Sequence, residues 1–350
     1  MQYLPRIADS LLARKLQAFG AVNITGPKGC GKTTTARQQA RSVVEFQDED
    51  TREGLLQVAE TQPSRLLIGD NPRLFDEWQD APKMWGAVRK SVDDRGEKGL
   101  YILTGSSSTD VETPHTGTLR ISTLQMLPMS LWETRESNGE VSLTDLFSHP
   151  GGFDGCHSDL TVDGIIYAIC RGGWPGTLSI DDVDIRLDIA RDLFWQTTHV
   201  DISHVDSTRR SPQLAEAILR SYARNICTPA KTGTMLADVQ ANHDVGETAF
   251  REYVSALEKL GIVDDLPAWS PAIRSKTAIR TARKRNPIGP SLAVAALGVT
   301  PECFDTDFKT LGFRFEPLRL PDLKLVATGT EYGYGRDDGV IVVSIGCLAP

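Results

Sequence analysis

The chain has 350 residues, of which 40% are hydrophobic and 24% are charged, a composition typical of folded globular proteins. The length predicts more than one domain, and the composition excludes a wholly disordered chain or a fibrous repeat. The net charge of −8 argues against a protein that coats nucleic acid non-specifically, although residues 201–300 carry 13 Lys and Arg against 10 Asp and Glu.

Two further observations concern the cellular compartment. No run of about 18 apolar residues occurs, so we expect no transmembrane helix, and the first 12 residues lack the apolar core of a signal peptide. The six cysteines form no Cys-x-x-Cys pair and have no metal-ligand spacing. These features predict a cytoplasmic protein with reduced thiols and no membrane partner.

The first 130 residues alternate short apolar runs with helical stretches. Strands are expected at Ala21–Thr25, Ser42–Phe46, Leu66–Gly69 and Leu100–Thr104, with Arg73–Asp76 as a fifth candidate that Arg73 interrupts. Helices are expected between them, notably at Lys32–Arg41 and Lys83–Asp94. This alternation predicts an α/β fold with a parallel sheet covered by helices on both faces.

The strongest motif is GPKGCGKT over residues 26–33, which fits the phosphate-binding pattern G-x-x-x-x-G-K-[ST] between a strand and a helix. Backbone N–H groups of this loop and of the following helix would face phosphate oxygens. Lys32 would contact the β- and γ-phosphates, and Thr33 would bind Mg²⁺. The residues expected to bind ATP are Gly26, Pro27, Lys28, Gly29, Cys30, Gly31, Lys32, Thr33 and Thr34. Of these, Lys28 is expected to extend into solvent, and Cys30 to be a small filler.

A pair of carboxylates follows the weaker strand candidate. Asp76 at the end of that strand would bind Mg²⁺. Its neighbour Glu77 would polarise the attacking water as a general base. Asp70 is a competing carboxylate, but the Asn-Pro after it favours a turn.

Two polar positions further along the chain are candidates for contact with the γ-phosphate. The strand at Leu100–Thr104 leads into a hydroxyl-rich turn, and either Thr104 or Ser106 would serve as a sensor there. Arg120 would stabilise transition-state charge, either within its own subunit or across a subunit contact. The sequence does not decide between Thr104 and Ser106. It also does not decide whether Arg120 acts within its own subunit or across a contact in a homo-oligomer.

The middle of the chain has a different organisation. Residues 137–155 contain turn signals and few apolar residues, which indicates a boundary or an exposed insertion. Residues 159–223 are predicted to be helical, with a sharp turn at 171–175. Residues 234–269 predict helix, turn, helix and extended segment, the order found in a winged helix-turn-helix.

Together these motifs resemble a large prokaryotic family of AAA-type ATPases that carry a C-terminal domain of unknown function. The resemblance covers about residues 1–320, and its motifs are YLPR at 3–6, the phosphate loop, LFDEWQDAP at 74–82, ILTGSSS at 102–108, LPMSLWE at 127–133 and RGGWP at 171–175. It implies that ATP and Mg²⁺ are bound, that the catalytic residues are Lys32, Glu77, Ser106 and Arg120, and that the metal residues are Thr33 and Asp76. It also implies an ATPase domain at 1–135, a helical domain at 136–230, a winged-helix-like domain at 231–300 and a region similar to restriction endonucleases at 301–350.

The last 50 residues depart from that family. A helix is expected at Phe308–Phe315 and a strand at Val340–Ile345, but no Asp/Glu-x-Lys sequence follows the strand. Metal-dependent nucleases need clustered carboxylates to bind Mg²⁺. We therefore expect this region to be a truncated and catalytically empty remnant.

Residues 231–285 are the candidate surface for a macromolecular partner. The stretch from Arg274 to Arg285 holds six cations and no carboxylate, as in a wing that contacts phosphates. Against this, the expected reading helix begins with Glu247, and Arg251 is its one basic residue before residue 259. Double-stranded DNA and a protein client both remain alternatives, and the charge of the helix favours the protein client.

The sequence supports three functional hypotheses in decreasing order. The first is a Mg²⁺-dependent AAA-type ATPase whose hydrolysis repositions the helical and winged-helix region. The second is a nucleotide-gated DNA-binding or regulatory protein with little hydrolysis. A small-molecule kinase is disfavoured because a carboxylate pair followed by a hydroxyl sensor suits transfer of the phosphoryl group to water.

Overall fold

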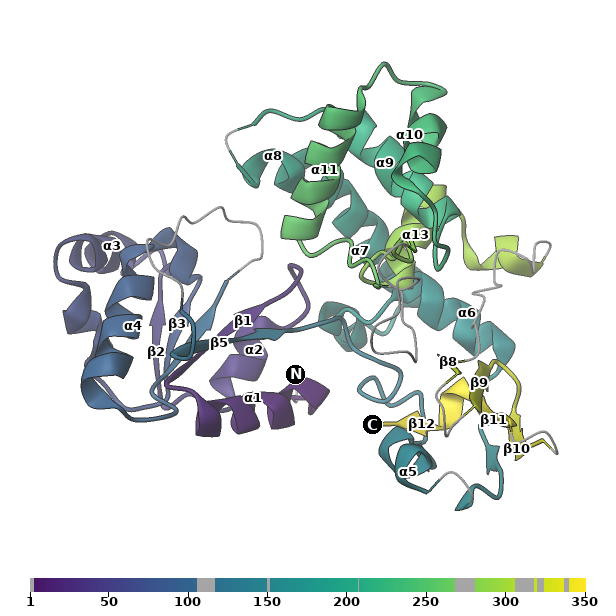
Figure 1. Ribbon diagram of the computed structural model, residues 1–350, viewed down its shortest axis with the longest axis horizontal. Helices are drawn as coiled ribbons and strands as arrows, with labels where there is room; N and C mark the ends of the chain where they lie inside the picture. The colour runs from purple at the N-terminus through teal and green to yellow at the C-terminus, as the bar shows by residue number, and fades with distance from the viewer. Residues whose placement is uncertain are drawn as a thin grey trace. The chain divides into compact units, whose positions relative to one another are not determined.

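A computed structural model of the chain describes residues 3–105, 117–149, 152–206, 208–267, 281–305, 318–319, 324–336 and 340–350. Its elements are labelled along the chain in Figure 1. The chain divides into two compact units. The first comprises Met1–Pro128 with two short segments, His204–Thr208 and Lys259–Gly261, and the second comprises the other residues from Met129 to Pro350.

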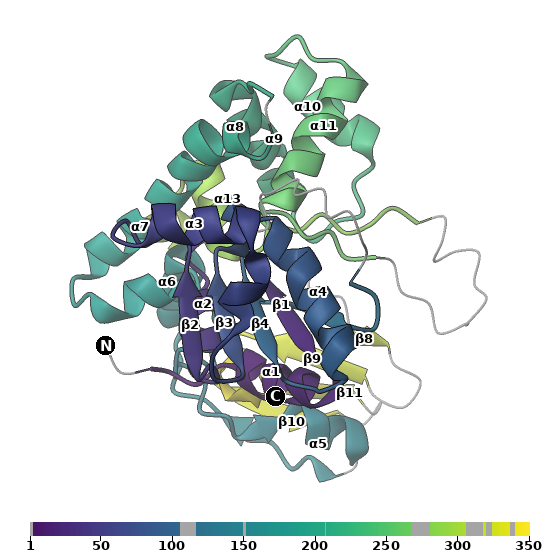
Figure 2. The same cartoon turned by 90° about the vertical axis from the view of Figure 1, so that its left-hand side faces the viewer.

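The first unit is built on a five-stranded sheet in the order β2-β3-β4-β1-β5, with every neighbouring pair parallel. Its strands are β1 (Ala21–Thr25), β2 (Ser42–Glu45), β3 (Arg73–Asp76), β4 (Tyr101–Thr104) and β5 (Ile121–Gln125). Its helices are α1 (Ile7–Ala18), α2 (Lys32–Arg37), α3 (Arg52–Thr61) and α4 (Lys83–Arg95), with short 3-10 turns at η1 (Pro63–Leu67) and η2 (Trp78–Asp80). Figure 2 shows β2, β3, β4 and β1 side by side. The predicted α/β fold is confirmed, and the C-terminal ends of all five strands share one edge, where such sheets bind ligands.

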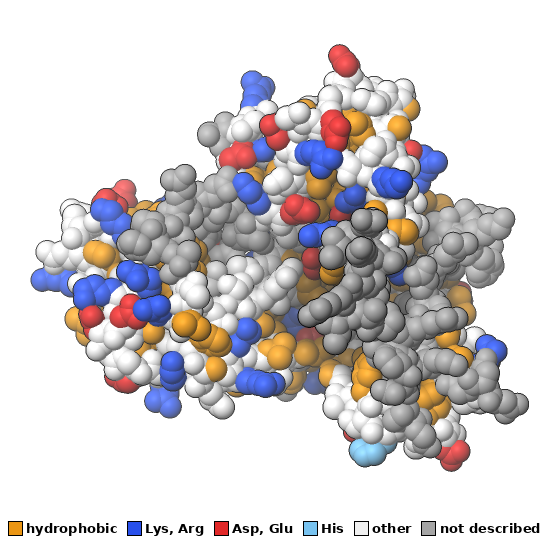
Figure 3. All heavy atoms as spheres, in the orientation of Figure 1, with side chains coloured by type: hydrophobic (Ala, Val, Ile, Leu, Met, Phe, Trp, Pro, Cys, Tyr) orange, Lys and Arg blue, Asp and Glu red, His pale blue; other side chains and the backbone are white. Residues whose placement is uncertain are grey.

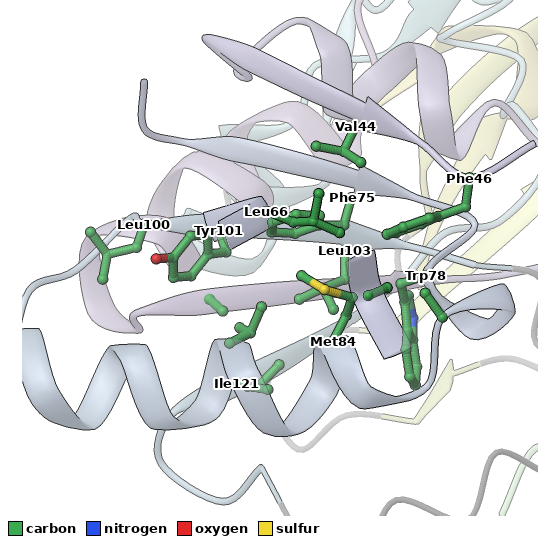
Figure 4. Close-up of a cluster of buried hydrophobic side chains, with 14 of the residues drawn as sticks. Val44, Phe46, Leu66, Phe75, Trp78, Met84, Leu100, Tyr101, Leu103 and Ile121 are labelled. Atoms are coloured by element: carbon green, nitrogen blue, oxygen red, sulfur yellow. The ribbon is translucent and has the colours of Figure 1, made fainter. Parts of the chain in front are cut away.

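The main core of this unit lies between the sheet and α4. Phe75 from β3, Leu103 from β4 and Met84 from α4 are fully buried, and Figure 4 shows these side chains between the strands and a long helix. Val88 and Val92 continue the buried face of α4 at a spacing of four residues. This packing fixes β3 and β4, whose ends carry the site residues.

One predicted strand of this unit is wrong. The apolar run Leu66–Gly69 does not join the sheet, because Pro63–Leu67 forms a 3-10 helix with its proline in the first turn. The weaker candidate is a true strand, although it begins with Arg73. The guanidinium of Arg73 donates to the Leu66 carbonyl (2.7 Å) and to the Ser42 hydroxyl (2.9 Å), which keeps its charge hydrogen-bonded at the end of the strand.

Helices overlap all three segments that the sequence predicts to be helical in the middle of the chain, 159–223, 235–241 and 246–260. From Val162 to Leu297 the second unit consists mainly of helices. They are α6 (Val162–Arg171), α7 (Val183–Gln196), α8 (Ile202–His204), α9 (Pro212–Arg224), α10 (Thr232–Gln240), α11 (Glu247–Lys259) and α13 (Pro290–Leu297), with short helical turns at η4 (Pro175–Ser179), η5 (Thr197–Asp201) and η6 (Pro301–Asp305). Side-chain oxygens of Thr161, Asp182 and Ser211 accept backbone N–H groups at the starts of α6, α7 and α9. These caps explain where the three helices begin.

The LPMSLWE and RGGWP motifs meet at one junction in the second unit. The Met129 N–H donates to the Gly173 carbonyl (2.6 Å). A Cβ at Gly173 would lie 1.9 Å from the Met129 oxygen, so the close approach requires glycine. Next to it, Arg171 makes two hydrogen bonds of 2.8 Å to the Glu136 carboxylate, and its side chain is almost completely buried.

The C-terminal residues form a second sheet, in the order β7-β10-β11-β9-β8. The strands are β7 (Cys156–His157), β8 (Leu318–Arg319), β9 (Lys324–Thr328), β10 (Tyr332–Gly335) and β11 (Val340–Ser344); the chain then continues through η7 (Ile345–Cys347) to β12 (Leu348–Ala349), which pairs with β6 (Val141–Ser142) ahead of α5 (Leu143–Ser148). Val141, Leu146 and Cys156 share a buried cluster with Ile341 and Val343. The segment expected to be a boundary or an exposed insertion therefore packs against the C-terminal strands.

The two elements expected near the C-terminus have different outcomes. The predicted strand at Val340–Ile345 is present as β11. The expected helix at Phe308–Phe315 lies outside the described residues. Among the helices that the structure describes, none combines the length and the apolar character that crossing a bilayer requires.

Candidate nucleotide-binding site

The predicted phosphate loop connects β1 to α2 at the C-terminal edge of the first sheet. Gly26, Gly29 and Gly31 have φ values of 150°, 77° and 98°, a region that favours glycine. A Cβ at Gly26 would lie 2.4 Å from the Met126 oxygen, so this position tolerates no side chain without movement of the backbone. The helix starts at Lys32, as predicted, but ends at Arg37, before the predicted end at residue 41.

Lys32 is held inside this loop. The residue is 7% exposed, and its ammonium donates to the carbonyl oxygens of Gly26 (3.0 Å) and Pro27 (2.9 Å). Both of these partners are neutral carbonyls, so they do not neutralise the charge of the buried ammonium. An anion bound in the loop would do so. Phosphate oxygens would compete with these two carbonyls for the ammonium.

The other loop residues divide by exposure. Lys28, Gly29 and Thr34 are exposed, whereas Pro27 and Cys30 are buried. Burial raises the pKa of the Cys30 thiol, which keeps this cysteine protonated and unreactive. These placements agree with the expectation of a solvated Lys28 and a Cys30 that fills space.

The two predicted metal residues lie together. The Thr33 hydroxyl donates to Oδ1 of Asp76 at 2.7 Å, although 43 residues separate them. The Thr104 hydroxyl donates to the same oxygen. Parallel pairing explains the second contact, because Asp76 and Thr104 are partners in the register of β3 and β4. A hydroxyl and a carboxylate at one point are ligands that suit Mg²⁺.

Glu77 follows Asp76 directly and has an unusual backbone. Its φ and ψ are 53° and 47°, a left-handed conformation that is uncommon for residues other than glycine. Its carboxylate accepts a hydrogen bond from the Gln79 amide. The next residue, Trp78, donates from its indole to the Asn23 side chain (3.2 Å). The turn after β3 is therefore fixed on both sides of Glu77.

Of the two remaining catalytic candidates, one lies outside the described residues and the other lies away from this cluster. Ser106 lies outside the described residues, so the choice between it and Thr104 as a sensor stays open. Arg120 precedes β5 at the N-terminal edge of the sheet, roughly 13 Å along the strand from the edge that carries the loop. It forms an ion pair with Asp93 (2.7 Å). Within one chain, the structure therefore does not support the expected contact of Arg120 with the γ-phosphate.

Sequence reasoning assigned no role to Arg6. This arginine is 8% exposed, and its guanidinium donates to the carbonyl oxygens of Cys30 (2.7 Å) and Leu127 (2.8 Å). It therefore ties the phosphate loop to the segment that follows β5. Its partners lie 24 and 121 residues away, so no local spacing pattern marks them. The one available signal was the place of Arg6 in the YLPR motif. Nearby, the Tyr3 hydroxyl donates to Asp9 (2.6 Å), and it forms a hydrogen bond with Thr35 (3.2 Å).

Two known families match separate parts of the chain. Residues 18–135 match the AAA domain family, and residues 163–302 match a domain of unknown function (DUF8612). No curated protein matches the chain. The phosphate loop, Asp76 and Glu77 all lie within the segment that matches the AAA domain family.

Three solved structures have a similar course of the chain over most of its length. The Walker-type ATPase PABY2304 of Pyrococcus abyssi is 13% identical, with a TM-score of 0.49, and covers 84% of this chain and 96% of its own. The replication initiator DnaA bound to AMPPCP and single-stranded DNA is 11% identical, with a TM-score of 0.33, over 74% of this chain and 89% of its own. AMPPCP-bound DnaA from Aquifex aeolicus is 11% identical, with a TM-score of 0.32, over the same shares. These values are too low to indicate a function.

Proposed function

We propose that the chain is an ATP-binding, Mg²⁺-dependent ATPase of the AAA type. The observation that carries the proposal is the convergence of Lys32, Thr33 and Asp76 at one edge of the sheet, with Glu77 next in the chain. Each residue type matches one task in the transfer of a phosphoryl group to water. The match of residues 18–135 to the AAA domain family supports the same reaction class.

The roles follow from the chemistry of each side chain. The loop amides and the Lys32 ammonium would bind the triphosphate. Thr33 and Asp76 would hold Mg²⁺, which neutralises phosphate charge when it is bound. Thr104 would orient the Asp76 carboxylate through its hydrogen bond. Glu77 would accept a hydrogen bond from the attacking water and align it.

ATP hydrolysis and nucleotide binding, measured on matched variants, test this proposal. Lys32→Ala should abolish binding of a fluorescent ATP analogue, because it removes the buried cation. Glu77→Gln should retain nucleotide binding but lose at least tenfold in kcat. Lys98→Ala and Glu49→Gln change exposed residues outside the site and should leave both quantities unchanged. Wild-type hydrolysis by Glu77→Gln would refute the assignment of the base.

The structural consequence of hydrolysis is the finer part of the proposal. We infer that it repositions the helical and winged-helix-like region, residues 136–300. Three helices, α9, α10 and α11, precede two extended segments that pair antiparallel through Val263 with Pro287 and Leu266 with Lys284. Changes in hydrogen exchange of α10 and α11 on addition of ATP and Mg²⁺ would test the repositioning.

Contact with double-stranded DNA is the second candidate for this region. Arg283 is exposed next to the paired segments, which supports the candidate. However, basic and acidic side chains are interspersed over α10 and α11 on the face in Figure 3. The exposed acids of α11, including Glu247 and Glu252, would repel phosphates. A protein client therefore remains the preferred partner.

Arg285 must be removed from the residues expected to contact DNA. Its guanidinium pairs with the buried Asp265 carboxylate and donates to the Ala230 carbonyl (2.9 Å). These contacts occupy the guanidinium of Arg285 within the protein, so it is not available to bind DNA. The DNA test should therefore neutralise Arg283 and Lys284 alone, and salt-dependent binding that these changes weaken would favour the candidate.

A further inference from the structure

We propose that Gln79 is a positioning residue that holds the Glu77 carboxylate in place for hydrolysis. The inference rests on the proposed ATPase function and adds a residue to which the motifs assigned no role. Gln79 lies in η2, the short turn directly after the Asp-Glu pair. It acts through Glu77 and does not contact the nucleotide in this proposal.

The first observation is the contact between the two side chains. The Gln79 amide donates to Oε2 of Glu77, and Gln79 is 9% exposed. A buried amide has little freedom to rotate, so the carboxylate that it binds is confined as well. Only one carboxylate oxygen is engaged in this contact, which leaves Oε1 of Glu77 for a water molecule.

The second observation is the backbone of Glu77. Its left-handed conformation turns the chain sharply after β3. The indole of Trp78 is meanwhile fixed on Asn23 and packs against Trp85, with 5.0 Å between the ring centroids. The main chain of the turn is thereby set, and the remaining freedom of Glu77 is in its side chain. The amide of Gln79 restricts that freedom.

The third observation connects Gln79 to the end of β4. A Cβ at Gly105 would lie 2.4 Å from Oε1 of Gln79, so the glutamine packs directly against this glycine. Within the described residues, Oε1 accepts no hydrogen bond from the protein. The amide is therefore wedged between Glu77 and the first residue after β4, and a side chain at Gly105 would displace it.

Two substitutions disturb this contact in different ways. Gln79→Met keeps the length of the side chain but removes the donor. Gly105→Ala keeps the glutamine and pushes its amide away. We expect each to lower kcat about tenfold while the Kd for a non-hydrolysable ATP analogue changes less than twofold, because misplacement of a general base affects the chemical step. Gln57→Met on the exposed face of α3 is the matched control and should have no effect.

A double-mutant cycle with Glu77→Gln separates positioning from general damage to the fold. If Gln79 acts through Glu77, then Gln79→Met should have no further effect on kcat in the Glu77→Gln background. Equal losses in both backgrounds, or loss of nucleotide binding, would overturn the inference and leave the ATPase proposal intact. Hydrolysis that is insensitive to Glu77→Gln would instead refute the assignment of Glu77 on which the inference depends.

Discussion

The Arg6 guanidinium and the Cys30 carbonyl are joined by a 2.7 Å hydrogen bond that links the residue before α1 to the phosphate loop. A second hydrogen bond of the same guanidinium reaches Leu127, so one side chain fixes the distance between two segments. Planar guanidinium groups suit this task because their donors diverge in a rigid fork. The order of the loop therefore depends on a residue that lies outside the motif.

Removal of this link should weaken nucleotide binding. We expect Arg6→Ala to raise the Kd for ATP about tenfold, because the loop loses a buried hydrogen bond of a charged group. Arg6→Lys should recover only part of the affinity, since an ammonium lacks the fork. Titration with a fluorescent ATP analogue measures both, and Arg14→Ala on the exposed face of α1 is the control. Full affinity in Arg6→Ala would contradict this role.

The Thr104 hydroxyl should set the metal requirement. Thr104→Val keeps the branched shape in a fully buried position but removes the donor to Asp76. We expect the Mg²⁺ concentration that gives half-maximal ATPase activity to rise about tenfold, as for other residues that orient a metal ligand. Thr123→Val, at an exposed position of β5, should leave the metal dependence unchanged. An unchanged curve for Thr104→Val would mean that Asp76 needs no such support.

The Asp265–Arg285 ion pair should be a large contributor to the stability of the second unit. The side chain of Asp265 is 2% exposed, and it also accepts a hydrogen bond from the Asn286 N–H (3.1 Å). Arg285→Met would leave this carboxylate buried without its cation, at a cost of about 3–5 kcal/mol in the free energy of unfolding. Urea unfolding followed by circular dichroism measures the change. Arg283→Met, at an exposed site, should alter stability by less than about 0.5 kcal/mol.

Thiol chemistry should distinguish the cysteines by environment. Cys303 is exposed, and hydrogen bonds with the N–H and the hydroxyl of Thr300 lower its pKa. Burial instead raises the pKa of Cys170 to about 11. A lower pKa means more thiolate at pH 7.5, so iodoacetamide should alkylate Cys303 before Cys30 and Cys170. Peptide mass spectrometry measures the order, and in urea the differences should disappear. Slow labelling of Cys303 in the folded protein would contradict the assignment.

Local motifs predicted the centre of the site, and long-range contacts explain what they missed. Lys32 and Thr33 are specified by a loop of eight residues, and Asp76 and Glu77 are adjacent in a short motif. Arg6 has partners up to 121 residues away, which no spacing rule can reveal. The positioning role assigned to Gln79 depends on a left-handed backbone at Glu77, and no glycine in the sequence signals it.

The accuracy of the fold prediction followed the strength of the local pattern. The buried strand at Ala21–Thr25 was predicted correctly because a continuous apolar run between turn residues is a clear signal. The strand Ile121–Gln125 was not predicted, since three of its five residues are polar. The run at Leu66–Gly69 was misassigned because short apolar runs do not by themselves distinguish a strand from a short helical turn.

The short segment after β5, Met126 to Met129, is held at both of its ends. Met126 touches Gly26 at the phosphate loop, and only two residues separate it from Met129, whose N–H is bound to Gly173 at the start of the second unit. A Cβ at Gly26 would meet the Met126 oxygen at 2.4 Å, and a Cβ at Gly173 would meet the Met129 oxygen at 1.9 Å, so an alanine at either glycine would collide with the backbone of the same short segment.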